Sequence, residues 1–170
     1  MTPEQAKDMA AFFFSVIDQE IPTTQKVIRA IPESGRDYRP DDKSRSALEL
    51  ARHLAAGDLF FLHAIADGQF GAYDASVEES FASFAEAADF FDKAWPAALV
   101  KVRALDGEAL AKPLDMMGAF EFPAVIYLSF LIRHQVHHRG ELTAYVRAAG
   151  GKVPSIYGPS ADEQWKPPNA

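Results

Sequence analysis

The sequence predicts an all-α protein, a four-helix bundle with long connections between its helices. Helix start and stop signals recur along the chain, whereas strand signals are weak. These signals delimit four helical stretches of about 25 residues, each about 37 Å long at the rise of an α-helix. The 170 residues contain no internal repeat, and their number suits one domain spanning 1–170.

The first helix is predicted over residues 3–30. Residues 2–5, TPEQ, supply a threonine cap, a proline in the first turn and an acid near the positive end of the helix dipole. Pro22 lies inside this stretch, so a kink is expected shortly before it. Residues 32–43 are rich in Pro, Gly, Asp and Arg and are predicted to form a loop.

The second helix is predicted over residues 44–67, where an Asp-Gly pair stops it. A linker, 68–76, then leads to a third helix over 77–105. This third helix follows a Ser-Val-Glu-Glu start signal, and Pro96 is expected to bend it.

Residues 106–122 show no clean period and are predicted to be a long connection, with a short extended piece at 119–122. The fourth helix is predicted over 123–149, where a Gly-Gly pair stops it. The tail, 152–170, is predicted to be irregular, and its end, 166–170, is expected to be loose.

The composition narrows the partners and the location. The net charge of −7 and the pI near 5.2 disfavour binding to nucleic acid or to an anionic membrane. The absence of cysteine excludes disulfides and thiolate nucleophiles of the chain's own. The sequence shows neither a signal peptide nor an apolar run of about 20 residues, so a cytoplasmic protein is expected.

Three of the five histidines fall in one short stretch of the fourth predicted helix: His134, His137 and His138. His134 and His138 are four residues apart, so on a helix their imidazoles lie one above the other on one face. Such a pair is half of a metal site and needs a third ligand from another helix. His137 lies at the edge of this face, where we expect it either to contact the metal ligands without binding the metal or to pack against neighbouring side chains.

A helical projection places His134 at the centre of the inward face of the fourth helix, with His138 beside it. Glu141 also points inward, where a carboxylate is costly without a partner, and it is a candidate catalytic residue. Tyr127 and Tyr145 share this face and are candidates for lining a ligand pocket. The residues expected on the opposite face are Ser129, Arg133, Arg139, Thr143 and Arg147.

Two further histidines remain, and both lie on the second predicted helix. His53 flanks the apolar stripe of that helix, beside Ala56 and Gly57, whose small side chains leave free volume. His63 is turned away from the stripe and is expected to be exposed. Glu49, one turn before His53, is either a hydrogen-bond partner of its imidazole or an ordinary exposed residue.

Four segments of the chain share a wider pattern. They are LELARHLAAGDLFFL around His53, HQVHHRGEL around His134 and His138, the closing GGKVPSIYGPSAD, and the early TTQKVIRAIPESGRDYRPDDKSRSALEL. Together they resemble the DinB-like (DinB/YfiT-type) family of bacterial four-helix metalloproteins, and the likeness covers nearly the whole chain. The HxxHHRG[QE]L element with an upstream histidine is fairly specific to this family.

The resemblance implies a bundle with a non-sequential helix order. It also implies a divalent metal held by His53 of the second helix and by His134 and His138 of the fourth. The family often has Gln where this chain has Glu141, which leaves open whether this residue acts as a neutral hydrogen-bonding group or as a base. Some relatives transfer low-molecular-weight thiols or isomerise substrates with a thiol cofactor. Others are stress-associated proteins without an assigned reaction.

Three neutral imidazoles on a divalent ion leave a coordination position open, which indicates Lewis-acid chemistry. Zinc, nickel or iron suits such ligands. We therefore expect a mononuclear metalloenzyme that catalyses thiol-dependent transfer or hydrolysis on a small-molecule substrate. Because the chain has no cysteine, the thiol would be a low-molecular-weight cofactor. The alternative is a non-catalytic stress-response or ligand-binding module in which the metal is structural or sensory.

A homodimer is expected from the apolar residues Ile132, Val136 and Val146 on the outer side of the fourth helix, which can face the first helix or a second subunit.

Motifs for rival chemistries are absent from the sequence. It contains no E-x-x-H pair of a di-iron bundle, no H-E-x-x-H, no Gly-rich phosphate loop and no G-x-S-x-G.

Overall fold

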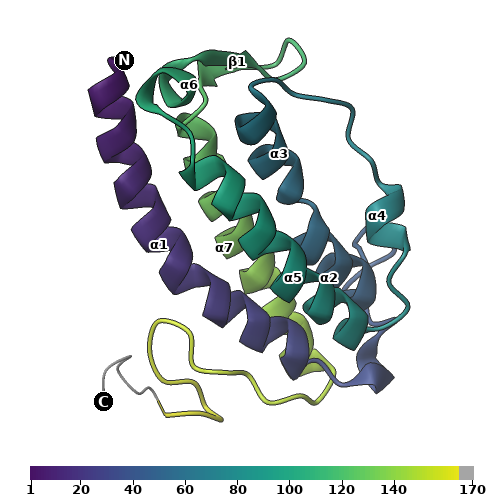
Figure 1. Ribbon diagram of the computed structural model, residues 1–170. Coiled ribbons are helices and arrows are strands. Elements are labelled where there is room, and N and C mark those ends of the chain that lie inside the picture. The colour runs from purple at the N-terminus through teal and green to yellow at the C-terminus, as the bar shows by residue number, and fades with distance from the viewer. Residues whose placement is uncertain (165–170) are drawn as a thin grey trace.

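The structure, a computed structural model, describes residues 1–164 and is mostly helical (Figure 1). The long helices are α1 (Pro3–Ala30), α5 (Phe84–Arg103) and α7 (Ile126–Ala148). Two shorter helices, α2 (Ala47–Ala56) and α3 (Leu59–Asp67), follow one another along the side of α5. The end that was predicted to be loose, 166–170, lies outside the described residues.

The first predicted helix is confirmed with its bounds. Thr2 caps α1, because its hydroxyl accepts a hydrogen bond from the backbone N–H of Gln5 while the Gln5 side chain accepts one from the Thr2 N–H. The helix continues through Pro22 as a single element. A short 3-10 helix, Glu33–Gly35, follows it within the predicted loop.

The prediction of one helix over 44–67 is wrong, because the helix is interrupted at Gly57 and Asp58. The helix also begins later than expected: Ser46 caps α2 and exchanges hydrogen bonds with Glu49. The predicted stop is confirmed, since Gly68 ends α3 in the left-handed conformation with φ of 69°.

The third helix was predicted to begin at residue 77, but the long helix α5 begins only at Phe84. Its first residues form the single turn α4 (Ser76–Glu79), and the chain then leaves the helical path before Ser83 caps α5. The connection from α3 to α4 runs down the outside of the α2–α3 segment, and α4 packs against α2 (Figure 1).

The all-α prediction is corrected by a small antiparallel sheet. Its strands are β1 (Pro113–Asp115) and β2 (Glu121–Pro123), and the short helix α6 (Gly107–Ala111) precedes them. An extended piece was predicted near β2, but β1 and α6 were not predicted. The last helix, α7, begins three residues later than expected.

The packing of α7 explains why two of its residues that were predicted to face outward, Arg139 and Val146, are buried. This helix contacts α1 on one side and α2 and α3 on the other, so it has more than one covered face. Arg139 was expected to face away from the site, yet it is only 1 % exposed because α1 and the C-terminal tail cover it. Val146 was expected on the outer side and is fully buried in the chain's own core, whereas Val136 is 36 % exposed.

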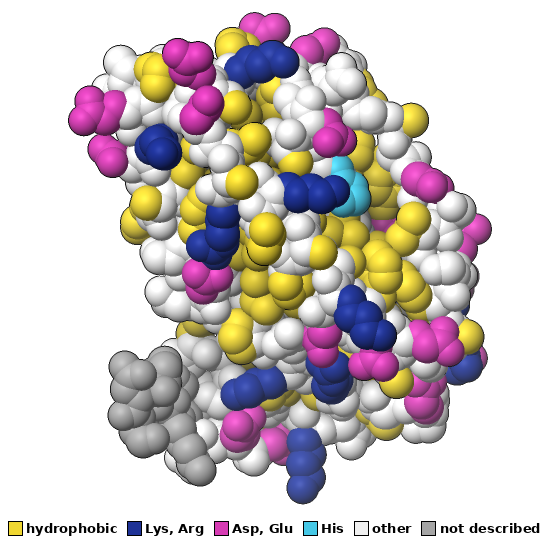
Figure 2. Space-filling view, viewed as in Figure 1, with side chains coloured by type: hydrophobic (Ala, Val, Ile, Leu, Met, Phe, Trp, Pro, Cys, Tyr) yellow, Lys and Arg dark blue, Asp and Glu magenta, His cyan; other side chains and the backbone are white. Residues whose placement is uncertain are grey.

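The surface seen in Figure 2 carries acidic and basic side chains spread around a central band of hydrophobic side chains. Within residues 1–164, no helix combines the length and the apolar character needed to cross a bilayer.

Candidate metal centre

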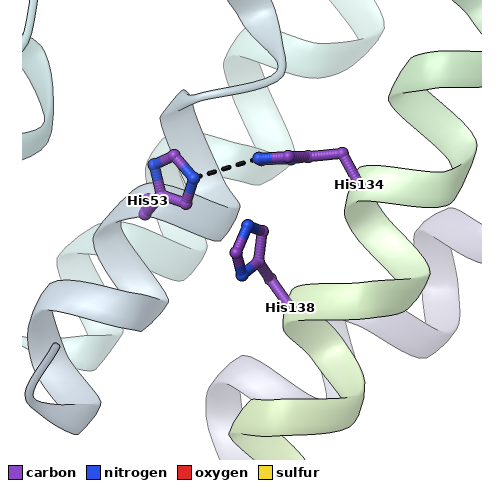
Figure 3. Close-up of side chains that lie close together, drawn as sticks. All are labelled: His53, His134 and His138. Atoms are coloured by element: carbon purple, nitrogen blue, oxygen red, sulfur yellow. Dashed lines mark hydrogen bonds between the residues drawn. The ribbon is translucent and has the colours of Figure 1, made fainter. Parts of the chain in front are cut away.

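Three histidines that are distant in sequence meet between α2 and α7 (Figure 3). His53 comes from α2, and His134 and His138 come from successive turns of α7. One ring nitrogen from each of the three lies within 4.8 Å of the others. The structure therefore brings together the three residues that the sequence predicted as ligands, in a cluster compatible with metal binding.

The contact between His53 and His134 is close. Their Nε2 atoms are 3.0 Å apart. Two imidazole nitrogens on one tetrahedral Zn²⁺ would be about 3.3 Å apart, given Zn–N bonds of about 2.0–2.1 Å. The observed spacing is thus near that of two ligands on a shared ion.

In all three histidines the Nδ1 atom of the ring lies beside a carboxylate. Nδ1 of His53 is 2.8 Å from Oε1 of Glu78, which lies on α4, and Nδ1 of His138 is 2.7 Å from Oε2 of Glu141. A carboxylate beside Nδ1 favours the tautomer that is protonated there. The Nε2 atoms then carry lone pairs, which is the form that binds a metal.

The third carboxylate, Asp58, is fully buried at the break between α2 and α3. Its Oδ1 is 2.8 Å from Nδ1 of His134, although the N–H is not aligned well enough to form a regular hydrogen bond. Gln135 donates to the other oxygen, Oδ2, at 2.5 Å. Burial raises the pKa of the Asp58 carboxyl, and the interactions with His134 and Gln135 oppose this rise.

The charges around the cluster favour a cation. Three carboxylates surround three imidazoles, and burial lowers the pKa of His138 to about 4 despite the opposing effect of Glu141. His138 is therefore neutral at pH 7 and does not balance the negative charge. A cation held by the Nε2 atoms of His53 and His134, which lie 3.0 Å apart, would satisfy both the imidazoles and the carboxylates.

Gly57 makes room for His53. A Cβ atom at position 57 would lie 2.8 Å from the His53 carbonyl oxygen and 3.0 Å from its ring atoms Nδ1 and Cε1. The His53 ring therefore lies close to the backbone of Gly57, in space that the Cβ of any other residue would restrict. The free volume predicted beside His53 is occupied by its own imidazole.

Two hollows meet at Glu78, next to the cluster. The first has a volume of about 420 Å³ and is lined mainly by apolar side chains, including Leu59, Phe60 and Val77. The second, of about 400 Å³, is lined mainly by charged side chains, including Arg52. The histidines themselves are partly accessible, and His134 is the most exposed of the three at 25 % of its side chain.

Other predicted residues lie outside the cluster. Glu49 is an exposed residue at the start of α2, where it accepts from the Ser46 N–H and lies 3.5 Å from Arg39. The carboxylate beside His53 is that of Glu78. His63 is exposed, as predicted. His137 is exposed too, and its Nε2 lies 3.7 Å from Glu141.

The candidate catalytic and pocket residues are placed as follows. Glu141 was expected to point inward, but its side chain is 45 % exposed at the rim of the cluster. Tyr127 is buried, and its hydroxyl donates to carbonyl oxygens of the hairpin formed by β1 and β2. Tyr145 packs edge-on against Tyr38. A role for these tyrosines in lining a ligand pocket stays a prediction.

Sequence reasoning missed Asp58 and Glu78. Asp58 had a detectable signal, because an acid next to a glycine interrupts an otherwise apolar helical stretch. Glu78 had none, since its position depends on the path of the connection between α3 and α4.

The comparison with protein families gives a match over nearly the whole chain. A model of the DinB family matches residues 7–168. The chain belongs to the DinB family. The histidine cluster thus lies within a DinB chain, in the segments that carried the resemblance.

Two relatives of this DinB chain come from Bacillus subtilis (strain 168). The uncharacterized protein YrdA is 46% identical over 56 residues, which are 33% of this chain and 32% of YrdA. The uncharacterized protein YjoA is 26% identical over 129 residues, which are 75% of this chain and 82% of YjoA. The matched part is thus about a third of YrdA but most of YjoA.

Solved structures share the DinB fold with this chain. A DinB-like protein from Bacillus cereus ATCC 10987 has a TM-score of 0.73 at 23% identity, covering 85% of this chain and 95% of that one. YjoA from Bacillus subtilis has a TM-score of 0.64 at 20% identity, covering 93% and 99%. A putative DinB member from Exiguobacterium sibiricum 255-15 has 0.62 at 21%, covering 91% and 97%.

Proposed function

We propose that this DinB protein binds one divalent transition-metal ion through His53, His134 and His138. The observation that carries the proposal is the orientation of the rings: the Nδ1 atoms lie beside carboxylates, while two Nε2 atoms meet at 3.0 Å. Zinc, nickel or iron suits an all-imidazole set. When bound, the ion would act as a Lewis acid at a coordination position that the protein leaves open.

The protein's own groups prepare this site. Glu78 and Glu141 hold the Nδ1 protons of His53 and His138, which directs their Nε2 lone pairs away from the carboxylates. Gly57 lets the His53 ring lie close to the backbone. The Asp58 carboxyl lies buried beside Nδ1 of His134.

We further propose that the site serves thiol-dependent transfer or hydrolysis on a small molecule. The chain has no cysteine, so a low-molecular-weight thiol would supply the sulfur. The two hollows share Glu78, the carboxylate partner of His53, and offer space for such molecules. The cytoplasmic location and the homodimer stay predictions.

The helix arrangement supports assignment to a bundle with non-sequential order. We infer that α1, the α2–α3 segment, α5 and α7 are its four members. Both α1 and the α2–α3 segment pack against α5 and α7, which is the arrangement of two diagonal pairs. The two ligand-bearing members, α2 and α7, are then neighbours.

Metal analysis tests the proposal. The purified protein should carry or take up about one equivalent of Zn²⁺, and His134→Ala should lose it because two of three ligands do not make a stable site. His63→Ala is the matched control, since His63 is an exposed histidine outside the cluster. A His134→Ala protein that keeps a full equivalent would refute the site.

An activity screen then separates the two functional readings. Turnover of an electrophile with a thiol, lost on adding chelator and restored by metal, would support the enzyme. Full metal occupancy without chelator-sensitive turnover would favour a structural or sensory metal in a non-catalytic module.

A further inference from the structure

We propose that Gln135 is a positioning residue for the metal centre, which acts on His134 through Asp58. The proposal rests on the metal binding proposed above. Gln135 follows His134 on α7 but points to a different side, and its side chain is buried between α1, α2 and the α2–α3 break.

All the hydrogen-bonding groups of the Gln135 amide are engaged. Its Nε2 donates to the Leu54 carbonyl oxygen at 3.0 Å and to Oδ2 of Asp58 at 2.5 Å. Its Oε1 accepts from the Thr24 hydroxyl at 2.9 Å. Gln135 and Thr24 are 3 % and 0 % exposed, so water does not compete for these bonds.

The neighbours of Gln135 fix which way its amide points. Arg139 donates to the Thr24 hydroxyl oxygen at 3.3 Å, so the hydroxyl proton is directed to Gln135. A flipped amide would set its oxygen against the Leu54 carbonyl and the Asp58 carboxylate, which are both acceptors. The Gln135 NH₂ group must therefore face Asp58.

Arg139 is itself held in place. Its guanidinium forms an ion pair with Glu20 of α1 at 2.5 Å and also bonds to the Tyr157 hydroxyl of the C-terminal tail. The buried polar chain, Arg139–Thr24–Gln135–Asp58, thus begins at a paired charge and ends at the metal centre.

This arrangement fixes Asp58 and, with it, His134. Because Gln135 holds Oδ2, the other oxygen of Asp58 lies 2.8 Å from Nδ1 of His134. These two atoms are buried and have no better hydrogen-bond partner among the described residues, so each is the other's counterpart. Moving Asp58 would turn the His134 ring and shift its Nε2 from the shared centre.

The test compares Gln135→Leu with the wild-type protein. Leucine keeps the bulk but cannot donate to Asp58. We expect Zn²⁺ affinity, measured by competition with a chromophoric chelator, to fall about tenfold, the lower end of the effect of losing a direct partner of a metal ligand, because Gln135 acts one step farther out, through Asp58. The visible spectrum of the Co²⁺-loaded protein should change as well, because it reports ligand geometry rather than stability.

Gln25→Leu is the matched control. Gln25 also donates its amide to a carboxylate, Asp92, at 2.7 Å, but on the α1–α5 side of the molecule. Its Zn²⁺ affinity and Co²⁺ spectrum should equal those of the wild type. Urea unfolding of the metal-free proteins separates any loss of stability from the loss of affinity.

A folded Gln135→Leu protein with wild-type affinity and spectrum would overturn the proposal. If this variant does not fold, Thr24→Val decides, because it keeps the shape but releases the Gln135 amide. Weaker Zn²⁺ binding and an altered spectrum would support the role, and wild-type values would overturn it. A wild-type protein that binds neither Zn²⁺ nor Co²⁺ would refute the proposed function itself, and this inference with it.

Discussion

Replacing Gly57 with alanine is expected to change the metal centre without replacing a ligand. The new Cβ would lie 2.8 Å from the His53 carbonyl oxygen and 3.0 Å from the ring atoms Nδ1 and Cε1. Ordinary contacts between such atoms are about 3.5–4.0 Å. The backbone at the helix end must therefore shift to relieve the contact with the carbonyl oxygen, and the His53 ring must move by roughly 0.5 Å to relieve the contact with its own atoms.

The size of this movement determines the expected loss. Metal–ligand distances tolerate about 0.2 Å, so a shift of roughly 0.5 Å takes Nε2 of His53 off its position. The same shift weakens the bond between Nδ1 and Glu78. We expect metal affinity to fall about tenfold or more, which corresponds to about 1.4 kcal/mol.

The stability of the metal-free protein should respond differently. Gly57 has helical backbone angles, φ −58° and ψ −37°, so alanine is not strained there. At compatible backbone angles, alanine loses less conformational entropy on folding than glycine, which stabilises the folded state by about 0.4–1 kcal/mol and offsets part of the steric cost. Gly57→Ala should therefore bind metal weakly while unfolding near the wild-type urea concentration.

Gly140→Ala is the matched control, because a Cβ at this glycine of α7 would meet nothing within 4 Å. It should gain up to about 1 kcal/mol of stability and keep wild-type affinity. Both variants are measured by chelator competition and urea unfolding. Equal Zn²⁺ affinity in Gly57→Ala and the wild type would refute the steric argument.

Three further outcomes are expected. Trp95→Phe should lower the free energy of unfolding by about 1–3 kcal/mol, since the buried indole N–H donates to the Ala55 carbonyl oxygen, while metal affinity stays unchanged. Tyr127→Phe should cost about 1 kcal/mol in urea unfolding by releasing the carbonyl oxygens of Leu114 and Phe120. Zn²⁺ at 100 times its Kd should stabilise the protein by about 2.7 kcal/mol, and calorimetry with excess chelator should show no such gain.

Local signals predicted the long helices well. The cap at Thr2 and the stop at Gly68 depend on nearby residues, and both are confirmed. The break at Gly57 and Asp58 was missed because apolar residues resume directly after it, so the stretch was treated as one helix. At this break Asp58 is buried, and Gly57 leaves room for the His53 ring.

The candidate ligands were predictable because helical spacing pairs His134 with His138, and a resemblance identified His53. Of the three carboxylates beside the histidines, only Glu141 was a candidate site residue, and it was expected to be catalytic. The projection of α7 also assumed one covered face, so it placed Arg139 on the outside. Contacts with α1 and with α2 and α3 bury two faces of this helix, which a single-helix projection does not represent.

The short helix α4 has a consequence for redesign. It carries Glu78 on the connection between α3 and α5 and packs against α2. Grafting a different connection at this point would exchange the anionic neighbour of His53 and reshape both adjoining hollows at once. Ligand preference would thus be altered by exchanging a single segment, with no substitution of the three histidines themselves.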